Sequence, residues 1–378
     1  MRIVLLTFDL GEYSVHLASA LAPYGEVHLL IPEVSLRPFG LMINGTFTVH
    51  TFAKPRLRQP LKQLAAVSTL ARQIRELRPD VIHVQQGHLW FNLALPFLSR
   101  FPLVVTSHDP LNHSSGEKTP QWIFDLAFRS ANQIIVHVPQ MKTLLSGRLN
   151  ILDDRIHIIP HPFFEHDPEN DDVPEDESLV LFFGRISEYK GLKYLIHAEP
   201  LISERVPTAR FVIAGTGDNL DTYRRMMTHP DKFTIYDEYL SNESRTQLFR
   251  KASVVVLPYT DATQSGVIPV AYSFAKPVIA TAVGGLPAQV DDGSTGILVP
   301  PRNAHALADA IVRLLRDPDL RRRYGANGRR RVIAEAKPEA VATATLAVYE
   351  RCIEESSHPR VRSLPSRSNV DKTNVHVH

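Results

Sequence analysis

Two cations follow a buried strand in the second half of the chain, in a setting that suits an anionic ligand. The apolar run Leu179–Phe183 predicts a strand, and Gly184 ends it. Arg185 and Lys190 come next, before helical spacing resumes at Gly191. A helix N-terminus contributes N–H groups and a partial positive charge, so cations beside it at the carboxyl end of a strand favour phosphate or diphosphate. We therefore expect an anion site in this loop.

Three more loops rich in small residues lie in the same half of the chain. They are Gly215-Thr216-Gly217-Asp218, Ser265-Gly266-Val267 and Gly284-Gly285-Leu286-Pro287. Missing side chains let backbone N–H groups approach a ligand, and the carboxyl ends of parallel strands meet at one edge of a sheet. We expect these loops to lie in one layer with Arg185 and Lys190.

Alternating strand and helix patterns must position these loops. Helical spacing separates the apolar runs, and continuously apolar strands indicate parallel sheets covered on both faces. The predicted fold class is α/β, with two doubly wound, Rossmann-like sheets facing a central cleft. The predicted strands are Arg2–Thr7, Val27–Ile31, Phe47–Thr51, Val81–Val84, Leu103–Thr106, Gln133–Val138 and Ile156–Ile159, then Leu179–Phe183, Phe211–Ala214, Phe233–Tyr236, Val254–Leu257, Val278–Ala280 and Gly296–Val299.

An acidic segment divides the two series. Residues 165–178 contain two prolines and no apolar periodicity, which is typical of a linker. It separates an N-terminal domain, residues 1–164, from a C-terminal domain, residues 179–337. An amphipathic helix over 338–355 is expected to pack back toward the N-terminal domain. Residues 356–378 show no apolar face and are expected to form a disordered tail.

Composition excludes several classes of protein. The 378 residues are 44% hydrophobic and 22% charged, and their net charge of +2 is too small for the global basic field of a nucleic-acid binder. The single cysteine, Cys352, excludes an intrachain disulfide and a cysteine-based zinc site. Without a long apolar run or a signal-peptide pattern, a cytoplasmic protein is expected, with contact at the inner membrane face as an open alternative.

The order of these motifs resembles a known family. The chain reads F-x-G-R-x4-K-G-x3-L, A-G-x-G-D, S-G-V before A-K-P-V-I-A-T, V-G-G-L-P, and D-G-x-T-G-x-L-V-P-P across residues 179–301. This order resembles the C-terminal domain of family-4 retaining glycosyltransferases of the GT-B fold, also called glycosyl transferases group 1. The N-terminal half is similar in layout and in the segment VVTSHD, which contains His108.

The resemblance implies a transferase that moves a sugar from a UDP-, GDP- or ADP-sugar to a glycan, a lipid-linked acceptor or a small molecule, with retention. It implies that Gly184, Arg185, Lys190, Ser265, Gly266 and Val267 bind the donor diphosphate. It also places His108 near the donor sugar, as a catalytic residue together with Arg185 and Lys190. Fixed cations would stabilise the departing nucleoside diphosphate, so no metal and no other cofactor is expected.

Other site residues are matched more weakly. Gly215, Gly217, Thr263 and Gln264 are candidates for the donor sugar or nucleoside. Gly11 and Glu12 are candidates for the acceptor side, together with Tyr13, Trp90 and His113. The family usually has two glutamates near the sugar and the ribose, but here Thr263 and Ala271 stand at those places.

Three other functions stay open. The missing glutamates allow a non-catalytic relative that binds a nucleotide sugar. A sugar-nucleotide epimerase of the same fold would need the same diphosphate site. An NAD-dependent enzyme would use Gly215-x-Gly217 after a strand and Asp237 as the ribose-binding acid, but Leu220 stands at the third glycine position.

Charged residues outside these motifs have simpler interpretations. Asp317-Pro318-Asp319 has the spelling of a metal-binding Asp-x-Asp, but its proline and its place after a helix favour a loop. Lys54, Arg56, Arg58 and Lys62 are expected to be solvated loop charges, with anionic lipid as the alternative partner. The arginines between residues 321 and 331 are expected to cover a solvated helical face.

Overall fold

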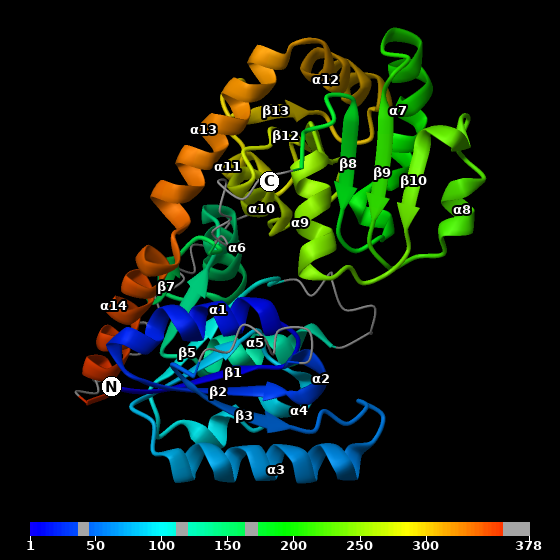
Figure 1. Ribbon diagram of the computed structural model, residues 1–378. Helices are drawn as coiled ribbons and strands as arrows, with labels where there is room; N and C mark the ends of the chain where they lie inside the picture. Colours follow the sequence, from blue (N-terminus) through cyan, green and yellow to red (C-terminus); the bar gives the residue numbers. More distant parts are fainter. Residues whose placement is uncertain (37–44, 111–119, 163–172, 358–378) are drawn as a thin grey trace, which may run out of the picture.

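The computed structural model describes residues 1–36, 45–110, 120–162 and 173–357. It contains two parallel sheets, each in its own domain, and Figure 1 shows one domain above the other. The predicted tail falls almost wholly outside these ranges, as do His113 and residues 165–172 of the predicted linker.

The first sheet has seven strands in the order β3-β2-β1-β4-β5-β6-β7. The order reverses between β1 and β4, which creates a crevice beyond the carboxyl ends of these two strands. The strands are β1 (Arg2–Thr7), β2 (Glu26–Pro32), β3 (Thr48–Phe52), β4 (Val81–Gln85), β5 (Leu103–Thr106), β6 (Gln133–Val136) and β7 (Ile156–Ile158).

The second sheet has six strands in the order β10-β9-β8-β11-β12-β13, and its order reverses between β8 and β11. The strands are β8 (Leu179–Phe183), β9 (Arg210–Ala214), β10 (Phe233–Tyr236), β11 (Val254–Leu257), β12 (Val278–Thr281) and β13 (Gly296–Val299). The predicted fold class is confirmed, and each predicted strand is present with its ends within two residues of the prediction.

Helices cover both faces of each sheet, as the continuously apolar strands require. In β1, Ile3 and Leu5 pack against one layer of helices, while Val4 and Leu6 pack against the opposite layer. The N-terminal helices are α1 (Gly11–Leu21), α2 (Glu33–Leu36), α3 (Pro60–Leu77), α4 (Leu89–Asn92), α5 (Gln121–Ser130) and α6 (Pro139–Leu149), with 3-10 turns η1 (Ala22–Tyr24), η3 (Leu95–Leu98) and η4 (Asp153–Arg155).

The second sheet follows the same rule. Val180 and Phe182 of β8 face one helix layer, and Leu179 and Leu181 face the other. The C-terminal helices are α7 (Leu192–Arg205), α8 (Leu220–Arg224), α9 (Asn242–Lys251), α10 (Val267–Ser273), α11 (Leu286–Gln289), α12 (Ala304–Arg316) and α13 (Pro318–Ala336), with turns η6 (Glu188–Lys190) and η7 (Pro230–Lys232).

The last helix, α14 (Pro338–Ser357), returns to the N-terminal sheet. It continues the direction of α13 along one side of the molecule and lies against α1, β4 and β5 (Figure 1). Val341, Val348 and Cys352 are buried in the N-terminal core, and the Tyr349 hydroxyl lies 2.5 Å from Nδ1 of His83. Part of the first domain's core is therefore supplied by the end of the described chain.

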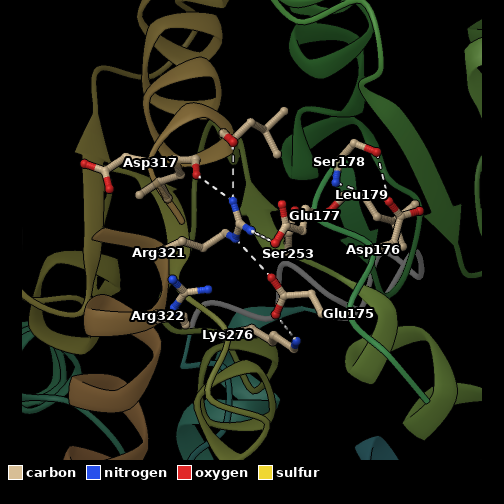
Figure 2. A network of polar contacts seen from close by, with 12 residues as sticks. Glu175, Asp176, Glu177, Ser178, Leu179, Ser253, Lys276, Asp317, Arg321 and Arg322 are labelled. Carbon is tan, nitrogen blue, oxygen red and sulfur yellow. Dashed lines mark hydrogen bonds and ion pairs between the residues drawn. The ribbon is translucent and has the colours of Figure 1, made fainter. Parts of the chain in front are cut away.

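The acidic segment before β8 is anchored by buried cations. Arg321 of α13 is 2% exposed, and its Nε donates to Glu175 at 3.0 Å. Lys276 donates to the second oxygen of Glu175 at 2.6 Å (Figure 2). The predicted solvated face is therefore wrong for Arg321, because its guanidinium donates to the carbonyls of Leu314 and Leu315 at the end of α12 and pairs with this carboxylate. Arg331 is likewise engaged, with Asp291 and Glu335.

Candidate functional site

A cleft of about 1480 Å³ lies between the domains, at the points where both strand orders reverse. Its N-terminal wall comes from the loops after β1, β3, β4 and β5. Its C-terminal wall comes from the loops after β8 and β11 and from the start of α10. The two switch points thus face one space, which is where open α/β sheets place their ligands.

The cleft gathers most of the predicted site residues. Arg185 and Lys190 line it from the β8 loop, and His108 lines it from the opposite domain. The remaining predicted residues that line it are Gly11, Glu12, Gly184, Thr263, Gln264, Ser265, Gly266 and Val267.

Lys190 is held in place by an aromatic neighbour. Its Nζ donates to the Tyr259 hydroxyl at 2.7 Å and lies 4.0 Å from the centre of the Tyr259 ring. The same hydroxyl lies 3.3 Å from Oγ of Ser265. Tyr259 therefore connects the cation of the β8 loop with the loop before α10, and sequence reasoning missed it because a lone tyrosine after a strand carries no signal of its own.

The Ser265-Gly266-Val267 turn is fixed by a glutamine. Gln289 of α11 accepts from the Ser265 N–H at 2.7 Å and donates to the Ser265 carbonyl at 3.1 Å. Gly266 has an ordinary φ of −69°, and a Cβ placed on it would meet no atom closer than Nε2 of His161 at 3.9 Å. The fold itself therefore has room for a side chain at Gly266, so its absence leaves open space on the cleft side.

Gly215 and Gly217 have a packing role. Neither lines the cleft. A Cβ on Gly215 would lie 2.0 Å from the Gly184 carbonyl oxygen, and one on Gly217 would lie 1.8 Å from that of Ile186. These glycines let the loops after β8 and β9 pack backbone to backbone, so the glycine pair that suggested an NAD fingerprint is explained by packing.

His108 is buried beside a second histidine. Nδ1 of His137 lies 2.9 Å from the Ile159 carbonyl, so it carries the hydrogen, and Nε2 of His137 accepts from Nδ1 of His108 at 3.1 Å. Burial lowers the pKa of His137 to about 3 and holds the pKa of His108 well below its usual range. Both rings are therefore neutral near pH 7. If Nε2 of His137 instead donated to His108, His137 would carry a hydrogen on both ring nitrogens and be charged, so this arrangement is excluded.

This tautomer leaves Nε2 of His108 as an acceptor. The nearest atom is Oε1 of Gln85, 3.1 Å away, and because an oxygen cannot donate, this tautomer requires the Gln85 amide to be turned so that its nitrogen faces His108. Tyr13 packs edge-on against the same ring, with 4.7 Å between centroids. His108 is thus fixed as a neutral group at the edge of the cleft.

The expected acceptor side carries a contact between the domains. Glu12, at the start of α1, accepts two hydrogen bonds from Arg245 of α9, at 2.9 and 2.7 Å. Tyr13 also lines the cleft. Trp90 does not, and its indole N–H donates to the Leu57 carbonyl at 3.2 Å. Sequence reasoning missed Arg245, since nothing in α9 marks one arginine as facing another domain.

The places of the two absent glutamates differ from each other. Thr263 lines the cleft. Ala271 is fully buried, and its neighbour Val270 lines the cleft at that point. Gln264 also lines the cleft, and its Oε1 is buried without a hydrogen-bond partner in the part of the chain that the structure describes. An unused acceptor of this kind is ready for a ligand hydroxyl.

The Asp317-Pro318-Asp319 segment was predicted to be a loop, but Pro318 and Asp319 instead begin α13, because a proline is tolerated in the first turn of a helix, where its missing N–H has no intrahelical partner. Oδ1 of Asp317 accepts from the Leu320 N–H at 2.9 Å as the N-cap of α13, and Asp319 pairs with Arg322. Both aspartates are therefore engaged in the first turn of α13.

The comparisons with known proteins agree with this architecture. Residues 177–317 match the family described as Glycosyl transferases group 1, and residues 10–163 match Glycosyltransferase Family 4. The chain belongs to the family-4, group 1 glycosyltransferases.

Curated relatives match this glycosyltransferase over different shares of their own length. D-inositol 3-phosphate glycosyltransferase of Corynebacterium glutamicum is 34% identical over 65% of this chain and 66% of its own length. Two other curated relatives are matched over only 40% and 47% of theirs, so the chain spans about half the length of those proteins. These two matches therefore cover only part of each relative.

Solved structures show the same fold at low identity. Sucrose-phosphate synthase of Thermosynechococcus elongatus has a TM-score of 0.76 and 22% identity, covering 94% of this chain and all of that one. Anabaena HepE in complex with UDP-glucose has a TM-score of 0.72 and 20% identity, covering 93% and 99%. The GT-B fold is therefore shared along nearly the whole glycosyltransferase. Within the described ranges, no helix is long and apolar enough to cross a bilayer.

Proposed function

We propose that this glycosyltransferase moves a sugar from a nucleoside diphosphate sugar to an acceptor with retention of configuration, and that the cleft holds both substrates. The observation that carries the proposal is the shared wall formed by Arg185, Lys190 and the Ser265-Gly266-Val267 turn, with His108 on the facing domain. Anabaena HepE, which has the same fold, is described in complex with UDP-glucose, and this supports a donor of that class.

The C-terminal wall would hold the diphosphate. Breaking the bond between sugar and phosphate leaves negative charge on the departing nucleoside diphosphate, and the guanidinium of Arg185 and the ammonium of Lys190, which both line the cleft, would stabilise it. The space at Gly266 lets a phosphate oxygen approach the backbone. These groups supply the positive charge that the leaving group requires, so we propose that the transfer needs no metal.

The sugar would lie between this wall and the N-terminal domain. We propose that the unpartnered Oε1 of Gln264 accepts from a sugar hydroxyl, in the region where Thr263 stands in place of a glutamate. His108, fixed as a neutral ring, would contact the same sugar from the other domain and orient it for attack. The leaving phosphate oxygen would accept the proton of the acceptor hydroxyl on the same face of the sugar.

The test is a binding and turnover screen with UDP-, GDP- and ADP-sugars. One donor should raise the melting temperature and be hydrolysed or transferred, because binding to the folded state increases its apparent stability. Replacing Arg185 or Lys190 with Ala should lower kcat by roughly 10²-fold or more. Arg225→Ala removes the same charge from an exposed position of the same domain and is the matched control. Normal turnover in the Arg185 and Lys190 variants would contradict the assignment.

A second candidate is a nucleotide-sugar-binding protein without turnover. It is favoured by Val270 and Ala271, which leave the α10 wall of the cleft without a carboxylate for the ribose. Binding of a sugar nucleotide with neither hydrolysis nor transfer across a panel of acceptors would favour this candidate.

A further inference from the structure

The N-terminal wall of the cleft carries its own group of cations, separate from the diphosphate wall. Lys54, Arg56 and Arg58 alternate with Pro55 and Leu57 in the loop between β3 and α3, and all five residues line the cleft. We call residues 54–58 the basic loop. Arg185 and Lys190 belong to the other domain, so the cleft presents positive charge from both sides.

The basic loop is held by bonds to three other elements. Gln63 of α3 donates to the Pro55 carbonyl at 2.6 Å, and Trp90 of α4 donates to the Leu57 carbonyl at 3.2 Å. Lys54 donates to the Phe8 carbonyl after β1 at 3.3 Å. Because the carbonyls of Pro55 and Leu57 both accept hydrogen bonds, the course of the basic loop is set before any ligand binds.

Two charges of the basic loop are not balanced. Asp9 forms an ion pair with Lys54, and Glu12 on the same wall is engaged by Arg245. Arg56 and Arg58 are exposed, and neither guanidinium has a hydrogen-bond or ion-pair partner within the described residues. Two adjacent cations in a cleft raise the local concentration of anions.

A buried histidine next to the basic loop adds an independent observation. His88 lines the cleft, is 7% exposed and stacks on Phe8 with 4.6 Å between centroids. Neither of its ring nitrogens has a hydrogen-bond partner within the described residues. Buried polar atoms of this kind usually bind something, so His88 supplies a donor and an acceptor that the protein itself does not use.

The cleft is large enough for two ligands. Its volume of about 1480 Å³ exceeds the roughly 300–1,000 Å³ of a usual small-molecule site. A nucleotide sugar on the C-terminal wall would leave the basic loop facing the remaining space. We propose that the basic loop, with His88, binds a phosphate ester group of the acceptor substrate, an inference that rests on the transferase function proposed above.

Arginine suits this task because its planar guanidinium meets two phosphate oxygens at once. The phosphate could belong to a soluble sugar or polyol phosphate, or to the headgroup of a lipid-linked acceptor. Leu61 and Leu64, in the first turns of α3, are 81% and 56% exposed and directly follow the basic loop in the chain. If the phosphate belongs to a lipid, these two leucines would contact the membrane, so replacing them tests the lipid source separately.

The experiment uses the intact protein with UDP present in excess to fill the diphosphate wall. Glucose 6-phosphate and inorganic phosphate are titrated by calorimetry, with glucose as the neutral counterpart of the sugar phosphate. Vesicles of phosphatidylglycerol and of phosphatidylcholine form the lipid arm. The variant Arg56→Gln/Arg58→Gln is compared with Arg72→Gln/Arg75→Gln, which removes the same charge from exposed positions of α3 that do not line the cleft.

Glucose 6-phosphate should bind at least roughly tenfold more tightly than glucose, and the Arg56/Arg58 variant should lose that preference while the control keeps it. Binding confined to phosphatidylglycerol vesicles, reduced by Leu61→Ser/Leu64→Ser, would assign the phosphate to a lipid. Equal binding of glucose and glucose 6-phosphate together with equal binding of both vesicles would overturn the proposal. Loss of UDP binding in the Arg56/Arg58 variant would overturn it too, because the basic loop would then belong to the donor site.

A UDP, GDP and ADP titration of the unmodified protein keeps the two proposals apart. Failure of every nucleotide would count against the transferase function, whereas normal nucleotide binding with no phosphate response would remove only the acceptor assignment.

Discussion

Glu12 and Arg245 form a bidentate ion pair that joins α1 of the first domain to α9 of the second at the cleft. Both side chains are about one-fifth exposed, so the pair is only partly screened by water. It is a direct contact between the two walls of the cleft.

The first prediction concerns this pair. Glu12→Gln should open the cleft, because Arg245 loses its counter-charge while the size of residue 12 is unchanged. Small-angle scattering should then give a larger radius of gyration than that of the unmodified protein. The exchange Glu12→Arg/Arg245→Glu should restore the original radius, and an unchanged radius in Glu12→Gln would show that other contacts hold the domains.

The second prediction separates the sugar from the nucleotide. Gln264→Ala removes the buried acceptor but leaves Arg185 and Lys190 in place, so the affinity for the free nucleoside diphosphate should be retained. The value of kcat/KM for the donor should fall by about tenfold, the effect of one neutral hydrogen bond. Equal losses for nucleotide and donor would place Gln264 at the nucleotide and not at the sugar.

The third prediction contrasts two glycines. Gly266→Ala should fold normally, because its φ is ordinary and its Cβ has room, yet it should weaken nucleotide binding by filling the space that the phosphate needs. Gly217→Ala should do the reverse and lower the stability, since its Cβ would overlap the Ile186 carbonyl. Melting temperatures with and without nucleotide distinguish the two effects.

The fourth prediction concerns pH. Burial lowers the pKa of His83 and of His137 to about 3, against a usual value near 6.5. Between these two pKa values the two histidines are protonated in the unfolded chain but not in the folded one. Their contribution to the free energy of unfolding should therefore be constant above about pH 7 and fall as the pH drops from 6.5 toward 3. Urea titrations between pH 4 and 8 measure this slope.

The slope should be smaller in His137→Gln, which removes one of the histidines that charge only on unfolding. His197→Gln, at an exposed position of α7, is the matched control. An unchanged slope in His137→Gln would assign the acid sensitivity to other groups.

The fifth prediction compares neighbouring arginines of α13. Arg321→Met should cost about 3 kcal/mol of unfolding free energy, because it removes a buried guanidinium that pairs with the part-buried Glu175 and donates to two carbonyls of α12. Arg322→Met, on the exposed side of the same helix, should change it by less than about 0.5 kcal/mol. Similar values from urea unfolding would contradict the structural role of Arg321.

The two sheets could be predicted from sequence because burial on both faces leaves continuous apolar runs, as in Leu179–Phe183. Arg185 and Lys190 could be located because their loop follows such a run. Tyr259 and Arg245 could not, since their importance depends on what lies opposite them in three dimensions. Arg321 was misread for the same reason, because a charged residue on a helix reveals its partner only when a distant carboxylate is placed beside it.

The glycines show a related limit. Gly184, Gly215, Gly217 and Gly266 look alike in sequence, and all were expected at the ligand. Gly215 and Gly217 are required by carbonyl oxygens of the neighbouring loop, whereas Gly266 is not required by the protein. Only the surroundings of the missing Cβ separate these two causes.

The return of α14 to the first domain means that the polypeptide passes between the domains twice, once between β7 and β8 and once between α13 and α14. The pair of Arg321 and Glu175 ties the start of the second domain to α13, which leads into the second passage. A body attached at two points turns most easily about the line that joins them. Opening of the cleft is therefore expected to be a hinge rotation of one domain relative to the other about a single axis, so that one angle describes the motion.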